Sequence, residues 1–196
     1  MGARQDSPLT SVRSAEAFGV EYMLPVGRRI ESRPYTLSLP AGTIPKKIGM
    51  LANGFPDADK FLEKLSVPLA KLWPGTEFRV VEKASADQLN IGIQEPLLTE
   101  LADECDAIVI AWGHCGSCTG GVTRDAVAFE ERGIPSVVVV CDIFWDYFAW
   151  MGQAMGLSDI PRIKIPFPLS GTGESNQLAW ADRIAPEVVA KLEGRQ

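Results

Sequence analysis

The sequence predicts an α/β fold, a doubly wound parallel five-stranded sheet with an irregular N-terminal arm. Three observations predict this fold class. Short apolar runs alternate with amphipathic patterns of helical period. The run Ile134–Val140 is apolar enough to be buried on both faces, as parallel strands that helices cover on both sides are. With 196 residues, of which 46% are hydrophobic, the chain can bury one full core.

Residues 1–45 are the predicted arm, and residues 46–196 are the predicted catalytic domain. The arm shows little periodicity, and its prolines interrupt any helix or central strand. They are Pro8, Pro25, Pro34, Pro40 and Pro45. The arm is either a tail or a segment that lies on another surface, such as that of a second subunit. The apolar residues that favour the second interpretation are Phe18, Tyr22, Met23 and Leu24.

The regular pattern begins with a strand over Ile48–Ala52, followed by a loop at Asn53–Gly54 and by Asp57 as a helix N-cap. The apolar stripe of that helix is Phe61, Leu62, Leu65 and Leu69. Pro68 is expected to kink the helix or to begin a new turn. The second strand is Phe78–Val81.

The remaining predicted elements continue the alternation of helices and strands. Leu97, Leu98 and Leu101 mark a helix, and Ala107–Ala111 is the third strand. The next helix opens at Gly120–Gly121 and has Gly133 at its C-terminal cap. Its buried residues are Val122, Ala126 and Phe129. The fourth strand is Ile134–Val140, and the helix after it has the inward-facing residues Phe144, Phe148, Met151 and Met155. An edge strand follows at Ile163–Ile165. The last helix has one apolar stripe, formed by Trp180, Ile184, Val188 and Leu192.

The positions of three loops predict a crevice at one edge of the sheet. By analogy with flavodoxin-like sheets we expect the strand order 2-1-3-4-5, in which the loops after strands one and three diverge to opposite faces. Asn53–Gly54 and His114–Cys115 would line the crevice between them, and Asp142 would lie next along its rim. Asn53, Gly54 and Asp142 are therefore substrate-binding candidates. Asn53 is equally well explained as a turn residue.

The segment His114–Cys118 contains the only histidine and two of the four cysteines of the chain. It lies where the third strand gives way to a helix. The C-x-x-C formed by Cys115 and Cys118 permits an intramolecular disulfide, and a helix N-terminus favours a thiolate. Cys115, Cys118 and His114 are the catalytic candidates. Backbone N–H groups from Cys118 onward, those of Gly120 and Gly121 included, are candidates for binding an anionic group of the substrate.

Several of these residues have simpler interpretations. A lone histidine is often a satisfied structural residue, and His114 could contact a sulfur only if its loop curls. No metal is expected, because a zinc site would have to combine Cys141 with the three catalytic candidates. Otherwise Cys105 and Cys141 are small buried hydrophobes. Arg124–Asp125 is expected on a solvated helical face.

Composition excludes several function classes. A net charge of −6 without a basic cluster argues against nucleic acid as a partner. No apolar run approaches the roughly 20 residues needed to span a bilayer, so no membrane is expected. Few cysteines and no apolar leader favour a soluble protein in the reducing cytoplasm. No glycine fingerprint indicates a nucleotide, Gly171–Gly173 is interpreted as a loop, and no cofactor is expected.

Four segments of the chain resemble the family named for its U-G-S-C motif, in which selenocysteine can occupy the first position. Cys115–Cys118 matches that motif with cysteine in the selenocysteine position. The similarity extends through Ile48–Gly54, Cys105–Val109 and Gly133–Val139, and the first 45 residues lie outside it. Members of this family are described as thiol or selenol oxidoreductases. The resemblance implies that Cys115 is the nucleophile and that Cys118 resolves the intermediate.

The first functional hypothesis is accordingly a thiol-dependent oxidoreductase that acts on a small-molecule substrate and is reset by an external thiol reductant. The second is a non-redox cysteine-dependent lyase, hydrolase or isomerase, based on a distant similarity to aspartate/glutamate racemase-like enzymes. The third is a subunit of a heteromeric enzyme with Phe144–Phe148 as its interface, although those aromatic rings are equally expected in the core. A homo- or hetero-oligomer is expected.

Overall fold

The structure is a computed structural model that describes residues 31–83 and 89–195. The predicted apolar residues of the arm, Phe18, Tyr22, Met23 and Leu24, lie outside the described residues. Of the helices that the structure does describe, none has the length and apolar character that crossing a membrane requires.

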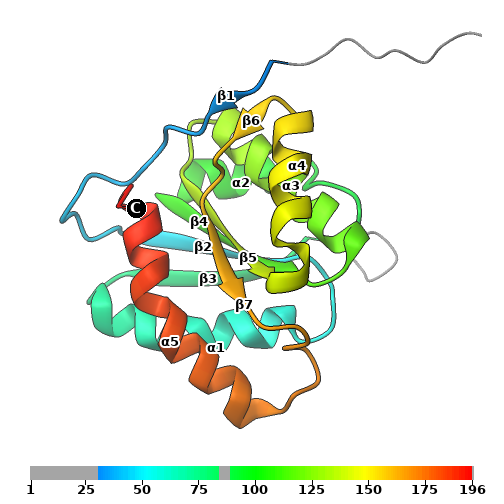
Figure 1. The fold of residues 1–196 in the computed structure, drawn as a ribbon. Helices are drawn as coiled ribbons and strands as arrows, with labels where there is room; N and C mark the ends of the chain where they lie inside the picture. Colours follow the sequence, from blue (N-terminus) through cyan, green and yellow to red (C-terminus); the bar gives the residue numbers. More distant parts are fainter. Residues whose placement is uncertain (1–30, 84–88, 196) are drawn as a thin grey trace, which may run out of the picture.

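The core of the molecule is one five-stranded parallel sheet with the order β3-β2-β4-β5-β7 (Figure 1). The strands are β2 (Lys47–Ala52), β3 (Glu77–Glu82), β4 (Ala107–Gly113), β5 (Ser136–Cys141) and β7 (Arg162–Ile165). Numbered along the chain within this sheet, the order is 2-1-3-4-5. The predicted α/β fold class and strand order are therefore confirmed.

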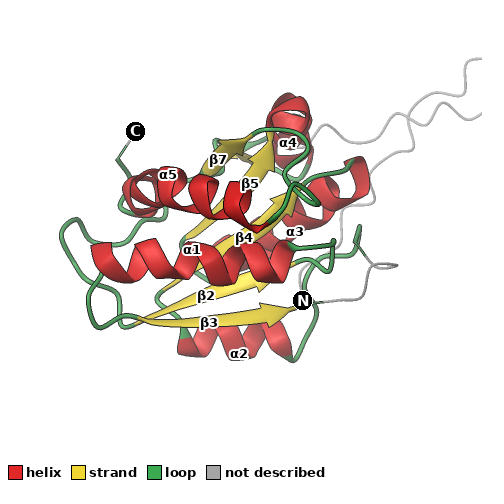
Figure 2. Ribbon diagram, turned by 90° about the horizontal axis from the view of Figure 1, so that it is seen from below, coloured by secondary structure: helices red, strands yellow, loops and turns green. Residues whose placement is uncertain are grey.

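Helices cover both faces of the sheet, as Figures 1 and 2 show. Helices α1 (Ala58–Leu72) and α5 (Glu174–Leu192) pack on one face, and their buried residues share one core cluster with the sheet. The opposite face carries α2 (Leu97–Glu104), α3 (Gly116–Glu131) and α4 (Trp145–Ala154), which follows a short 3-10 turn, η2 (Asp142–Phe144). Every residue of β4 and β5 is buried, because each of these strands lies between two helical layers.

The start of α1 differs from the predicted cap. Asp57 occupies the N-cap position, but its backbone is left-handed and its side chain makes no capping bond. Its carboxylate instead accepts hydrogen bonds from the N–H of Gly171 at 2.8 Å and from Gln177 Nε2 at 3.1 Å. The bond from Gly171 holds the pKa of Asp57 below its usual value. Pro68 lies inside α1 without ending the helix. Asp57 thus links the first loop of the domain to the loop before α5.

The described part of the arm packs on the domain. The short strand β1 (Arg33–Pro34) pairs in parallel with β6 (Leu157–Ser158), a two-stranded sheet that was not predicted. Arg33 forms an ion pair with the buried Glu130, and Tyr35 Oη accepts a hydrogen bond from the N–H of Ser136 at 2.6 Å. Leu39 is buried in the core cluster of α1 and α5. Residues 33–39 therefore contribute to the fold, while a domain boundary at residue 45 stays a prediction.

Candidate functional site

The cysteine segment follows β4 directly and begins α3. This helix starts at Gly116, four residues before the predicted start at Gly120, so that Cys115 is its N-cap. The Sγ of Cys115 accepts the N–H of Cys118 at 3.0 Å, and its carbonyl accepts the N–H of Thr119 at 2.9 Å. A sulfur therefore takes the capping role that a serine or aspartate oxygen usually has.

The two sulfurs of the motif are joined as a disulfide, with the Cα atoms of Cys115 and Cys118 5.0 Å apart. Their surroundings differ. Cys115 is half-buried, Cys118 is fully buried, and the flanking Gly116 and Ser117 are exposed. Ser117 Oγ lies 3.3 Å from the Sγ of Cys115. An incoming molecule can therefore approach Cys115 but not Cys118.

His114 is buried, and its ring faces the loop before α5. Its Nε2 accepts hydrogen bonds from the N–H groups of Leu169 at 3.1 Å and Ser170 at 3.2 Å. Since Nε2 accepts, the imidazole is neutral with its proton on Nδ1. Burial lowers the pKa of His114, which favours the same neutral form. These two amides occupy Nε2, the ring nitrogen that would have to accept a proton if His114 were a general base. A catalytic role of His114 stays a prediction.

Three aromatic rings surround the imidazole of His114, and none of them is among the predicted site residues. Phe55 stacks on His114 with ring centroids 4.8 Å apart, and Trp112 and Phe167 lie at 5.2 Å and 5.1 Å. Phe167 is exposed, so one side of this aromatic cluster faces solvent next to the cysteine loop. No local sequence signal connects Phe167 with His114, because they belong to different βα loops.

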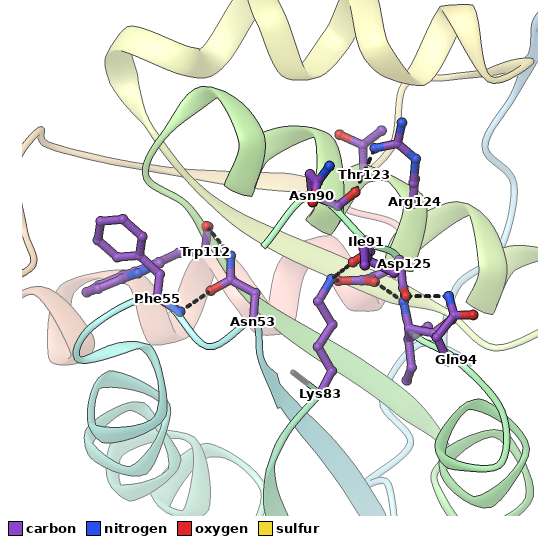
Figure 3. A network of polar contacts seen from close by, with 12 residues as sticks. Asn53, Phe55, Lys83, Asn90, Ile91, Gln94, Trp112, Thr123, Arg124 and Asp125 are labelled. Carbon is purple, nitrogen blue, oxygen red and sulfur yellow. Dashed lines mark hydrogen bonds and ion pairs between the residues drawn. The ribbon is translucent and has the colours of Figure 1, made fainter. Parts of the chain in front are cut away.

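The loops after β2 and β4 meet, as the predicted strand order requires. Asn53 Nδ2 donates to the carbonyl of Trp112 at 3.0 Å, and its Oδ1 accepts the N–H of Phe55 at 3.2 Å (Figure 3). Asn53 is fully buried, and both polar groups of its side chain are engaged within the protein. These contacts agree with the turn interpretation of Asn53. Gly54 is half-buried with a φ of +81°, which suits a residue without a side chain.

The two predicted glycine sites lie inside α3. Backbone N–H groups within a helix pair with carbonyls four residues earlier, so Gly120 and Gly121 do not present free donors. Gly121 instead allows the backbone at Leu89, in the loop before α2, to lie close to α3, because a Cβ at Gly121 would be 2.0 Å from the carbonyl oxygen of Leu89. The first-turn N–H groups, those of Gly116 and Ser117, have no helical acceptor. Binding of an anion at the start of α3 stays a prediction.

Asp142 lies at the carboxyl end of β5, as expected. It opens η2, is exposed, and its Oδ1 accepts the N–H of Ile143 at 2.8 Å. It is thus available on the same edge of the sheet as Cys115, but no hydrogen bond or ion pair joins its carboxylate to the cysteine loop in the described part of the chain. Its role in substrate binding stays a prediction.

A buried ion pair behind α3 was not predicted. Lys83 Nζ lies 2.6 Å from Asp125 Oδ2, and the two side chains are 1% and 0% exposed (Figure 3). Lys83 also donates to the carbonyl of Ile91 at 2.8 Å, and Asp125 Oδ1 accepts the N–H of Ile93 at 2.6 Å. The expectation that Asp125 lies on a solvated face is wrong, because the loop before α2 covers it; the neighbouring Arg124 is exposed.

The other two cysteines are buried, as expected. Cys105 and Cys141 are free thiols, and burial raises the pKa of Cys105 to about 11 and that of Cys141 to about 12. Cys141 belongs to the core cluster of α1 and α5. In residues 31–83 and 89–195, no three histidine, cysteine or carboxylate side chains are grouped so as to hold a metal. The alternative zinc set of His114, Cys115, Cys118 and Cys141 is therefore not brought together.

Comparison with known proteins gives one family. The sequence model of the UGSC family matches residues 21–194. This match begins well before Lys47, so the expectation that the first 45 residues lie outside the family is wrong for residues 21–45. No curated protein matches the chain. Among solved structures, the flavodoxin-like domain of a Synechococcus protein is 12% identical, with 74% of this chain and 97% of that domain covered and a TM-score of 0.40.

Proposed function

We propose that this chain, which belongs to the UGSC family, is a thiol-dependent oxidoreductase with Cys115 as nucleophile and Cys118 as resolving thiol. One observation carries the proposal: a half-buried cysteine at a helix N-cap is paired with a fully buried cysteine one helical turn away. Differences in access separate the roles of the two sulfurs, because a substrate must reach the nucleophile but need not reach the resolving thiol.

The reaction begins with the reduced pair. The N-terminus of α3 favours the thiolate of Cys115, and the N–H of Cys118 and the hydroxyl of Ser117 are the nearest donors to its sulfur. The thiolate attacks one sulfur of a small-molecule disulfide. A new S–S bond forms to Cys115, the substrate S–S bond breaks, and one substrate half leaves as a thiolate with the electron pair.

The second step uses the buried thiol. The Sγ of Cys118 attacks the Sγ of Cys115 and passes its proton to the departing substrate sulfur, which closes the intramolecular disulfide and releases the second half of the substrate as a thiol. The substrate disulfide has then gained two electrons, and the cysteine pair has lost two. An external dithiol, the second partner in this proposal, returns two electrons to the pair and is itself oxidised to a disulfide.

The remaining predicted site residues have two kinds of role in this proposal. His114 and Asn53 are positioning residues, since their polar atoms hold the loops that flank Cys115. Gly54 and Asp142 follow β2 and β5 at the same edge of the sheet and are proposed to shape the substrate site. Gly120 is buried inside α3 and is proposed to contribute through the packing of that helix. Gly121 keeps α3 close to the neighbouring loop.

Non-redox chemistry is the alternative, and the site favours it less. A lyase, hydrolase or isomerase needs a general acid or base beside the cysteine. Nε2 of His114 is occupied by two backbone amides, and Asn53 cannot transfer protons in this way. The hydroxyl of Ser117 lies 3.3 Å from the Cys115 sulfur, and a hydroxyl is a poor base at neutral pH.

The proposal is tested by trapping the intermediate with an aromatic disulfide reagent that releases a coloured thiolate, such as dithiobis(nitrobenzoate). Reduced wild-type chain is expected to release both halves of the reagent and to keep no adduct. Cys118→Ser should release one half and keep the other on Cys115, and Cys115→Ser should react slowly. Cys105→Ala is the matched control, because its thiol is buried and outside the pair. A Cys118→Ser chain that releases both halves without an adduct would exclude the resolving role.

The interface hypothesis for Phe144–Phe148 is only partly compatible with the positions of these side chains. Phe148 is buried, and Phe144 and Trp145 pack against the core. The exposed apolar residues of this region are instead Ile143, Tyr147 and Trp150. We propose that this exposed face supports an oligomer. Sedimentation of the purified chain tests that proposal: a monomer at high concentration would contradict it.

A further inference from the structure

A second feature of the molecule lies apart from the cysteine pair. A pocket of about 570 Å³ is formed by the arm, the residues that lead into β7, and the C-terminal end of α5. Figure 1 shows these three segments side by side, at the end of β7 opposite the cysteine edge. None of residues 113–121 lines it. Its volume is within the range of about 300–1,000 Å³ that is usual for small-molecule sites.

Two cationic side chains that form no ion pair among the described residues, Arg162 and Lys191, line this pocket. The guanidinium of Arg162 lies 4.2 Å from the ring centroid of Trp145, and its Nε is buried without a hydrogen-bond partner in the described part of the chain. Lys191 also lines the pocket and forms no ion pair among the described residues. The buried Nε is out of reach of a ligand, but the terminal guanidinium nitrogens of Arg162 and the Nζ of Lys191 form no ion pair among the described residues and can bind an anion that enters the pocket.

The acidic residues of the lining do not neutralise these cations by direct contact. Asp159 Oδ2 accepts a hydrogen bond from Ser158 Oγ at 2.9 Å, and the other carboxylate is Glu187. Neither forms an ion pair with Arg162 or Lys191. Burial lowers the pKa of Arg162, which reflects the cost of keeping this cation partly away from water.

The same pocket offers apolar and aromatic surface. Its lining includes Tyr35, Leu37, Trp145 and Ile160. Rings and aliphatic side chains of this kind pack against flat apolar molecules, whereas a site for a bare inorganic ion needs only polar groups. The combination therefore suits a molecule with one anionic group and one apolar part.

We propose that this pocket binds a small organic anion, a phosphate or carboxylate on a flat apolar body, with Arg162 and Lys191 contacting the anion and Tyr35 and Leu37 packing against the body. The Trp145 ring, which Arg162 and Lys164 contact at 4.2 Å and 4.6 Å from its centroid, holds these cations in place. The proposal is independent of the chemistry at Cys115, because the two sites share no residue. Both sources of the anion, a phosphate ester and a carboxylic acid, present oxygens that a guanidinium can bind in pairs.

Calorimetric titration of the full chain tests the proposal with four probes. Phenyl phosphate and benzoate combine an anion with a ring, phenol has only the ring, and inorganic phosphate has only the anion. We expect saturable binding at one site for phenyl phosphate, benzoate or both, and affinities at least about tenfold weaker for phenol and inorganic phosphate. Binding of neither aromatic anion overturns the proposal. Equal affinity for an aromatic anion and phenol also overturns it.

Substitutions locate the site. Arg162→Met and Lys191→Gln should each weaken binding of the aromatic anion by about tenfold. Arg183→Met is the matched control, because Arg183 also lies over a tryptophan, Trp180, at 4.5 Å but does not line the pocket. If Arg162→Met does not fold by circular dichroism, Lys191→Gln decides the test alone. Unchanged affinity in the folded pocket variants, or an equal loss in Arg183→Met, overturns the assignment.

Discussion

The stability of the fold should depend on pH through a single imidazole. His114 Nε2 accepts two backbone N–H groups, those of Leu169 and Ser170. Protonation would place a third N–H against these two donors. Burial lowers the pKa of His114 below its usual 6.5, so the folded chain resists protonation that the unfolded chain accepts. The folded state is therefore expected to lose stability as the pH falls through about 6.5.

The size of this effect follows from linkage. An unfolded imidazole with a pKa of about 6.5 gains about 1.4 kcal/mol from protonation between about pH 7.5 and about pH 5.5. The folded state gains nothing in this range while its imidazole stays neutral. The free energy of unfolding should then fall by up to about 1.4 kcal/mol over the same interval. The chain has no other histidine, so no second imidazole contributes.

Urea denaturation followed by far-ultraviolet circular dichroism measures this change. The control is His114→Gln, whose Oε1 can accept the same two N–H groups but does not titrate. Carboxylates contribute equally to both proteins, so the difference between them isolates the imidazole. Wild type should lose more stability than the variant between about pH 7.5 and about pH 5.5, by up to about 1.4 kcal/mol. The same pH dependence in both proteins would refute the role of His114 as a neutral acceptor.

Two further predictions concern the packing of α3. Gly121→Ala should destabilise the chain by about 1–3 kcal/mol, because its Cβ would lie 2.0 Å from the Leu89 carbonyl oxygen. Gly116→Ala, where a Cβ meets nothing within 4 Å, should change the melting temperature little, and equal effects of the two substitutions would contradict the close approach. Lys83→Met should cost about 3–5 kcal/mol in urea denaturation, since it leaves the buried Asp125 carboxylate unpaired. The double variant Lys83→Met with Asp125→Leu should recover most of that loss, and a double variant no more stable than the single one would contradict this explanation.

The parallel sheet could be predicted because its strands carry their own signal. Ala107–Ala111 is apolar on both faces, and so is Val137–Val140, which is the composition expected of a strand between two helical layers. The alternation of these runs with helical patterns then leaves few topologies. The cysteine loop could be placed for the same reason, because it follows one of these strands directly.

Other features depend on contacts between distant residues and left no local pattern. Lys83 and Asp125 are 42 residues apart, and neither position marks a buried pair in the sequence. The acceptor role of His114 depends on the amide of Leu169, 55 residues away. The predicted start of α3, Gly120, lies four residues after the observed start at Gly116, since Gly116 has low helix propensity and a cysteine is an unusual cap.

The order in which the four thiols react tests the central claim most directly. The fully reduced chain is treated with iodoacetamide at neutral pH, and modification is measured by mass spectrometry of peptides. Cys115 should react first and Cys118 more slowly, because Cys118 is fully buried. Cys105 and Cys141 should react last, since burial raises the pKa of their thiols to about 11 and about 12. Modification of Cys118 as fast as Cys115, or of Cys115 no faster than Cys141, would contradict the assignment of Cys115 as the nucleophile.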